Sequence, residues 1–114
     1  MNKYRNIKTV VDGITFDSKK EAARYGQLKL MEKAGEIAEL ELQPKFQMVV
    51  NGVKLGSYIG DFQYNEYLTP KAKRPKDEHD RVSVVEDVKG VKTPVYNLKK
   101  KLVKALYGIE IREI

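Results

Sequence analysis

The chain of 114 residues has the length of one ordinary domain, and its 41% hydrophobic residues allow a single core spanning residues 1–114. It contains no cysteine, which excludes a disulfide scaffold, a zinc–cysteine site and a thiol nucleophile. Because neither a signal peptide nor an apolar run of membrane-spanning length is found, we expect a cytoplasmic protein with no membrane partner, and its net charge of +6 favours a polyanionic partner.

The N-terminal part is expected to form a β-hairpin followed by a helix. Asp12-Gly13 stands between two β-forming segments, residues 4–11 and 14–16, and this is a hairpin signal. Ser18 and Glu21 have the spacing of a capping box, and the next glycine in a helix-ending position is residue 35. We therefore expect the helix at residues 19–34.

The middle of the chain is expected to form three strands. Asn51-Gly52 is a strong turn between residues 36–50, interrupted at Pro44, and residues 53–67, where Gly56 and Gly60 mark bulges or close approaches. Residues 69–81 are polar and contain two prolines, which predicts a loop, and residues 82–89 return as a strand.

The last part is expected to form a helix and a short strand. Thr93-Pro94 is a good helix start, Tyr107-Gly108 a good end, and isoleucines recur in residues 109–114. The helix has an apolar stripe that we expect to pack against the sheet: Val95, Leu98, Leu102, Ala105 and Leu106. A helix between two strands indicates a parallel crossover, so we expect one α/β domain with a mixed sheet.

The strand at residues 82–89 ends in charged residues, which are costly in a strand unless they are paired or bind something. Asp87 and Lys89 share one face of the strand, whereas Glu86 points to the other. Phosphodiester hydrolysis needs a divalent cation, for which a carboxylate is a ligand, and a nearby lysine can stabilise the developing charge. Such a pair also occurs by chance on solvated strands, so the motif alone is weak.

Two further carboxylates are candidate ligands. Asp61 lies one strand before Asp87, and adjacent strands would bring both carboxylates to one ion; the alternative is an aspartate held by a turn amide. Glu21 shares a helix side with Tyr25 and Leu28, and it is either the capping-box glutamate or an inward-leaning metal ligand.

The second helix carries candidate phosphate contacts. Residues 88–109 contain six lysines and no acid, which indicates a basic face. Tyr96 and Lys100 lie one turn apart, Lys99 borders the apolar stripe, and Lys92 precedes the helix. The alternative is a solvated, lysine-rich helix surface that binds nothing.

The arrangement of Glu21, Asp61 and Asp87-x-Lys89 resembles the PD-(D/E)xK nuclease superfamily, whose αβββαβ core matches the order expected from Ser18 onward. The stretches SKKEA, GDF, VEDVKG and YNLKKKLVKALYGI are similar to a family of small phage and prophage proteins. The resemblance covers nearly the whole chain, although Gly60 replaces the proline of the motif's name.

The resemblance implies a restriction-endonuclease-like fold and a metal-dependent site. Asp61 and Asp87 would be the main ligands of Mg²⁺ or Mn²⁺, Lys89 the catalytic lysine, and Glu21 the helix glutamate of resolvase-like members, also a ligand. Nucleic acid would be bound on the second helix, by Tyr96, Lys99 and Lys100 together with Lys92.

Three functions are compatible with these residues. We expect an endonuclease that hydrolyses branched DNA such as a Holliday junction in phage recombination or replication, in the cytoplasm of a bacterial host. We expect no further domain that reads sequence, so selectivity would come from DNA shape and a homodimer. The alternatives are a catalytically silent nucleic-acid-binding module and a phage adaptor that binds a host protein through residues 35–41 or 69–81.

Overall fold

The computed structural model describes residues 8–75, 80–88 and 92–114. These residues form one α/β domain with two α-helices and eight strands. In chain order the elements are β1 (Thr9–Val11), β2 (Ile14–Phe16), α1 (Lys19–Lys33), β3 (Ile37–Leu42), β4 (Lys45–Val50), β5 (Val53–Ile59), β6 (Phe62–Tyr67), the 3-10 helix η1 (Lys71–Lys73), β7 (Arg81–Asp87), α2 (Pro94–Tyr107) and β8 (Ile111–Glu113).

The ends of the first elements follow the local sequence signals. β1 and β2 are antiparallel, with Val11 opposite Ile14, and both turn residues between them have positive φ angles, as a tight hairpin turn requires. The Ser18 hydroxyl accepts a hydrogen bond of 3.1 Å from the backbone N–H of Glu21 and so caps α1. The predicted hairpin turn and first helix are therefore confirmed, while residues 4–7 of the predicted first strand lie outside the described residues.

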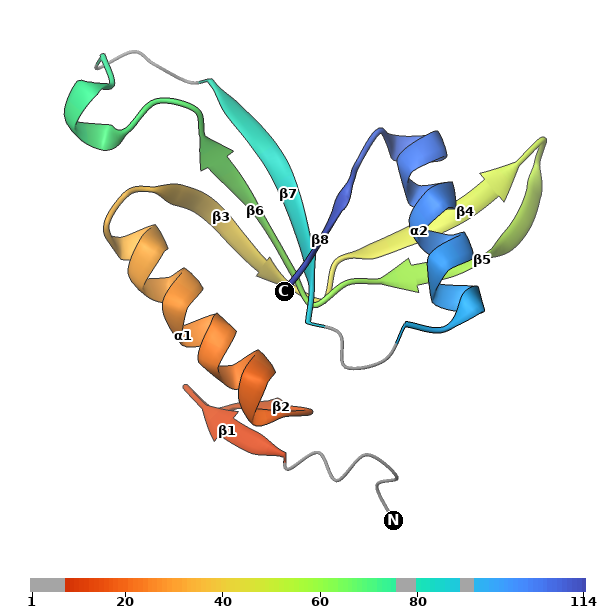
Figure 1. The fold of residues 1–114 in the computed structure, drawn as a ribbon, viewed down its shortest axis with the longest axis horizontal. Helices are drawn as coiled ribbons and strands as arrows, with labels where there is room; N and C mark the ends of the chain where they lie inside the picture. The colour runs from red at the N-terminus through yellow and green to blue at the C-terminus, as the bar shows by residue number, and fades with distance from the viewer. Residues whose placement is uncertain (1–7, 76–79, 89–91) are drawn as a thin grey trace.

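The central sheet has four strands in the order β3-β6-β7-β8. β3 and β7 are both antiparallel to β6, whereas β8 is parallel to β7 because α2 crosses over between them. Read from α1, these elements give the predicted αβββαβ order with a mixed sheet, as Figure 1 shows.

β4 and β5 form a separate antiparallel hairpin that leaves the sheet between β3 and β6. The prediction of one continuous strand at residues 53–67 is therefore wrong, because the chain turns at Gly60-Asp61. There Gly60 N–H donates to the Pro44 carbonyl at 2.9 Å, and Gln43 N–H donates to the Asp61 carbonyl at 3.0 Å. A Cβ atom on Gly60 would lie only 3.0 Å from a Val85 methyl group and 3.3 Å from the Pro44 ring, so a larger residue here would require these neighbours to shift.

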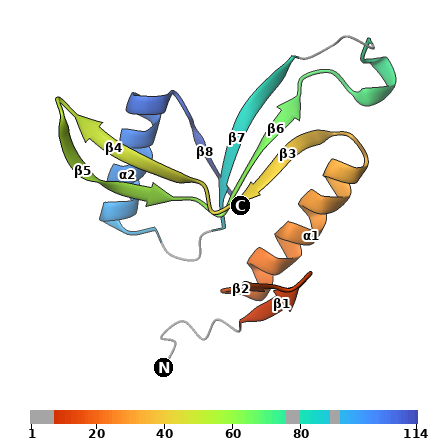
Figure 2. The ribbon, with the colours of Figure 1, turned by 180° about the vertical axis from the view of Figure 1, so that it is seen from behind.

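Two hydrophobic cores lie on opposite faces of the sheet. Neighbouring β7 residues alternate between them: Val84 packs with Tyr25, Leu28 and Phe62 beneath α1, and Val85 packs with the core of α2. Viewed from either side, α1 with β1–β2 lies on one side of β7, and α2 with the β4–β5 hairpin lies on the other (Figures 1 and 2).

The packed side of α2 differs from the predicted one. Tyr96 and Val103 are buried, whereas Val95 and Leu98 are 63% and 59% exposed. The buried side of α2 is the one that carries Tyr96 and Val103, and the ring of Tyr96 lies against that of Tyr58 at a centroid distance of 6.4 Å. No helix in the described part of the chain is long and apolar enough to cross a membrane.

Candidate active site at the strand junction

The carboxylates of Asp61 and Asp87 meet where β7 ends and β6 begins, at the junction in the centre of Figure 1. The antiparallel register pairs Phe62 with Glu86, which places the residues on either side of that pair, Asp61 and Asp87, next to each other. Asp61 N–H donates to the Glu86 carbonyl at 3.0 Å, and Val88 N–H donates to Asp61 Oδ2 at 2.6 Å. The expected adjacency of the two carboxylates is confirmed, and the turn-amide alternative is also partly met, since a backbone amide holds Asp61.

Asp61 has an unusual electrostatic environment. Its pKa is raised to about 7 by several causes together: burial raises it most, the N–H of Val88 lowers it, and the charges of Glu21 and Asp87 and a hydrogen bond with Asp87 raise it. The carboxyl thus titrates near neutral pH because it is buried and two other carboxylates crowd it.

Glu21 completes this group from the first turn of α1. Burial raises its pKa, as do the negative charges of Asp17 and Asp87. Tyr25 and Leu28 are buried on the same helix side, as predicted. The cap at Ser18 uses the Glu21 backbone N–H. The structure thus places Asp61 and Asp87 together, with Glu21 close enough for its charge to raise the pKa of Asp61, and Lys89 lies outside the described residues.

Asp87 is itself buried and is held by a tyrosine. The Tyr58 hydroxyl donates to Asp87 Oδ2 at 2.5 Å, from the end of β5, just before the chain re-enters the sheet. Burial and this hydrogen bond raise the pKa of Tyr58, so it remains a donor. Sequence reasoning missed Tyr58, because only the departure of the β4–β5 hairpin from the sheet carries it to the end of β7.

The donor set fits a hard divalent cation, although no complete ligand shell is formed. Across residues 8–75, 80–88 and 92–114, no three acidic or histidine side chains are arranged so that they could hold a metal ion. Asp61, Asp87 and Glu21 nevertheless supply only carboxylate oxygens, which Mg²⁺ and Mn²⁺ prefer. A cation bound beside Asp61 would offset the nearby negative charges and so return this carboxyl to its charged form.

Glu86 serves a different purpose from its neighbour Asp87. It is completely buried on the α1 side, where Arg24 binds both of its oxygens, with Nε to Oε1 at 2.7 Å and Nη2 to Oε2 at 2.6 Å. The Tyr64 hydroxyl also donates to Oε2. The predicted opposite orientation of Glu86 and Asp87 is confirmed, and the pair ties α1, with Glu21 one turn away, to β7.

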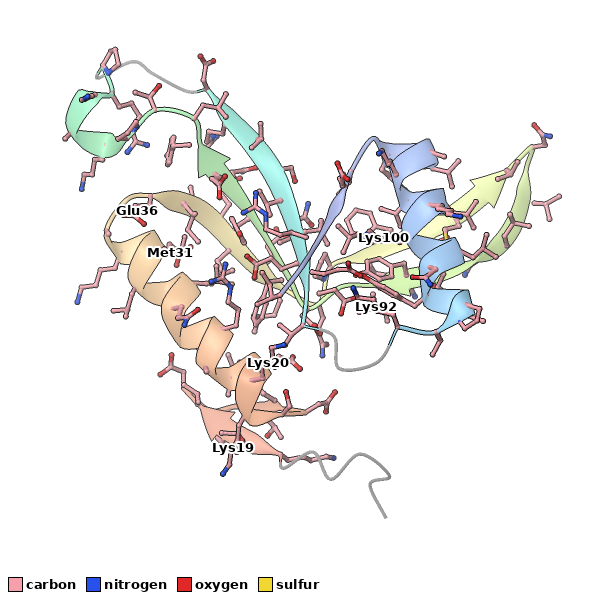
Figure 3. All side chains as sticks on the ribbon, in the orientation of Figure 1. Lys19, Lys20, Met31, Glu36, Lys92 and Lys100 are labelled. Carbon is pink, nitrogen blue, oxygen red and sulfur yellow. The ribbon has the colours of Figure 1, made fainter. Side chains whose placement is uncertain are left out.

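Three of the four predicted nucleic-acid contacts lie around Glu113 of β8. Lys92 Nζ and Lys100 Nζ each lie 3.2 Å from Glu113 Oε1, and the Tyr96 hydroxyl donates to Oε2 at 2.9 Å. These three donors hold the pKa of Glu113 below its usual value. Figure 3 shows Lys92 and Lys100 on the α2 side of the junction, beside β8. Glu113 was not predicted, and in the sequence only its place in an alternating C-terminal segment marks it.

Lys99 occupies a separate position on α2. It lines a hollow of about 470 Å³ between β5 and α2, with Tyr58, Tyr96, Ile59 and Val95 on its walls. The hollow therefore adjoins the tyrosine that holds Asp87. Lys99 does not join the group around Glu113, so the predicted lysines divide between two places.

Comparison with known proteins gives one match. A family model described as "Protein of unknown function (DUF1064)" matches residues 1–113. No curated protein matches the chain, and neither does any solved structure.

Proposed function

We propose that this chain, which belongs to the DUF1064 family, is a metal-dependent endodeoxyribonuclease that hydrolyses phosphodiester bonds in branched DNA. The observation that carries the proposal is the pair Asp61 and Asp87 at the end of β7, where burial, followed by the nearby charges of Glu21 and Asp87, raises the pKa of Asp61 to about 7. Carboxyl groups that titrate near neutral pH and have other carboxylates nearby are more typical of functional sites than of structural positions.

In this proposal Asp61 and Asp87 hold the cation, with Glu21 as a further ligand. Bound Mg²⁺ or Mn²⁺ would supply an activated water and neutralise charge on the phosphate. Tyr58 fixes the orientation of the Asp87 carboxylate, and the Val88 amide fixes that of Asp61. We keep Lys89 as the proposed catalytic lysine because it follows Asp87 by two residues.

The proposed substrate is DNA because the site is flanked by lysines and the chain carries a net charge of +6. Lys92 and Lys100 lie on the α2 side of the junction, and Lys20 lies at the start of α1 (Figure 3). We propose recognition of a branch such as a Holliday junction through the shape of its backbone, by a homodimer in phage recombination or replication.

A second candidate function is nucleic-acid binding without cleavage. It is favoured by the absence of a three-ligand metal group among the described residues. The two functions differ in one property, which is whether a divalent ion enables strand scission.

The test is cleavage of labelled four-way junction, flap, duplex and single-stranded DNA in Mg²⁺, Mn²⁺ or EDTA. We expect cutting of branched DNA in either metal and none in EDTA. Binding without cutting in every metal would leave the binding module as the better account, and absence of both would favour an adaptor that acts on a host protein.

A further inference from the structure

We infer that Lys92, Tyr96 and Lys100 form a binding site for a backbone phosphate of DNA, and that Glu113 fills this site until DNA displaces it. The inference rests on the proposed function for the identity of its ligand. It adds a phosphate site and an internal competitor, neither of which follows from the metal site.

The geometry around Glu113 is that of a bound anion. Two ammonium groups lie 3.2 Å from one carboxylate oxygen, and a phenol hydroxyl lies 2.9 Å from the other. A phosphate presents two oxygens in the same way and is bound by lysine and tyrosine donors. The three donors would therefore satisfy a phosphate without rearrangement of α2.

The position of this group next to Asp87 gives it a use in the reaction. Parallel pairing places Glu113 opposite Asp87, and Ile114 N–H donates to the Asp87 carbonyl at 3.1 Å. A phosphate in place of the Glu113 carboxylate would lie beside the proposed metal ligands. It would hold the DNA strand at the catalytic carboxylates.

The two ion pairs of Glu113 are partly exposed to solvent and so can be exchanged, whereas the ring of Tyr96 is buried. The side chains of Lys92 and Lys100 are 56% and 33% exposed, and that of Glu113 is 23% exposed. Ion pairs of this kind contribute little to stability, whereas a phosphate neutralised by lysine also releases condensed counterions. The Arg24–Glu86 ion pair differs from those of Glu113, because its carboxylate is fully buried and is not open to exchange with a ligand.

The test compares Glu113→Gln with Glu110→Gln by fluorescence anisotropy of a labelled four-way junction in EDTA over a salt series. Both changes remove one negative charge from the same segment, but Glu110 is 76% exposed and has only one ion pair, at 4.0 Å, within the described residues. Glutamine keeps the size of glutamate and an oxygen that can accept from Tyr96, so the fold is expected to survive.

We expect Glu113→Gln to bind the junction at least about 5-fold more tightly than Glu110→Gln. The plot of log K against log salt should steepen by about 0.9 to 1.8, as for one or two added phosphate contacts. Adding Lys100→Ala to Glu113→Gln should remove the gain.

Binding by Glu113→Gln that is equal to or weaker than that of Glu110→Gln would overturn the inference, as would absence of binding by every variant. If Glu113 served only to attach α2 to β8, Glu113→Gln would lower the melting temperature without tightening binding. A wild-type protein that binds as expected but cuts no DNA would overturn the nuclease proposal and leave the phosphate site standing.

Discussion

Asp61 is stabilised in its neutral form, and this makes stability depend on pH in an uncommon direction. Its pKa is about 7 in the folded protein and 3.8 as the ordinary value, so between these values the folded state holds a proton that the unfolded state has lost. The contribution of Asp61 to the free energy of unfolding is fully present below pH 3.8 and is lost as pH rises through 7.

Replacing Asp61 with asparagine should therefore stabilise the metal-free protein at pH 8. The asparagine side chain would still accept from the Val88 amide but would bring no charge near Glu21 and Asp87. We expect the melting temperature at pH 8 to rise by about 4 °C or more, with a much smaller rise at pH 5. Glu41→Gln, on the exposed side of β3, is the control for loss of one negative charge. A melting temperature that falls at pH 8 would contradict the electrostatic account.

A divalent cation should reverse this effect in the wild-type protein. Metal binding requires the deprotonated carboxyl, so Mn²⁺ should raise the melting temperature strongly at pH 8 and only weakly at pH 6. Asp61→Asn should lose most of the rise at both pH values. Differential scanning fluorimetry over a Mn²⁺ series measures this, and a rise of equal size in the variant would place the ion elsewhere.

At the scale of elements, the attachment of α1 to the sheet depends on the Arg24–Glu86 pair. Removing Arg24 leaves a buried, uncompensated carboxylate. We expect Arg24→Met to lower the free energy of unfolding by about 3–5 kcal/mol in urea titrations, and Glu86→Gln added to it to restore at least half.

Lys29→Met is the matched control on the same helix. Among the described residues Lys29 forms one ion pair, a partly exposed one with Glu32 at 3.3 Å, so its loss should cost under about 1 kcal/mol. If Arg24→Met is no more destabilising than Lys29→Met, the pair does not hold α1 in place.

The elements differ in how far the sequence determines them. Caps and turns are local features of the sequence. Ser18 therefore predicted the start of α1 correctly, and Asp12-Gly13 predicted the turn of the first hairpin. The Asp61–Asp87 adjacency was also predictable, because it follows from strand order and period.

Features set by tertiary packing were not predictable in this way. Gly60 lies close to Val85 where β4–β5 leave the sheet, and Tyr96 of α2 packs against Tyr58, so both features involve partners that are distant in sequence. Helical periodicity identifies an apolar stripe but does not say whether the sheet covers it. For the same reason Tyr58 and Glu113 were missed, since each reaches the site only through a partner that is distant in sequence.

At the scale of the whole molecule, the chain is flat and open. Its radius of gyration is 16.0 Å and its extents are 46 × 39 × 20 Å, whereas a compact domain of this length has a radius of gyration of about 13 Å. The open shape leaves large apolar side chains of α2 and β5 exposed, among them Leu98, Val95, Ile59 and Leu55. Ile59 and Val95 line the same hollow, beside Lys99, so exposed apolar side chains of the two elements lie near each other.

We expect this surface to be where two copies meet in the proposed homodimer. A two-fold axis brings the same patch of each copy together, and apolar surface of this kind is typical of such contacts. Leu98→Glu should convert a dimer into a monomer in size-exclusion chromatography with light scattering. Leu30→Glu is the control, because Leu30 is 69% exposed on α1. A wild-type protein that is monomeric at tens of micromolar would contradict the expectation.

In the proposed function, Asp87 and its neighbours form the site that cleaves DNA. Single-turnover cleavage of a four-way junction by Asp87→Asn is therefore the decisive measurement. The matched control is Asp80→Asn, an exposed aspartate that precedes the other end of β7. We predict a loss of at least about 100-fold for Asp87→Asn in Mg²⁺ and Mn²⁺, with junction binding retained in EDTA and wild-type rates for Asp80→Asn. Cleavage by Asp87→Asn at the wild-type rate would show that the carboxylates at the end of β7 are not the active site.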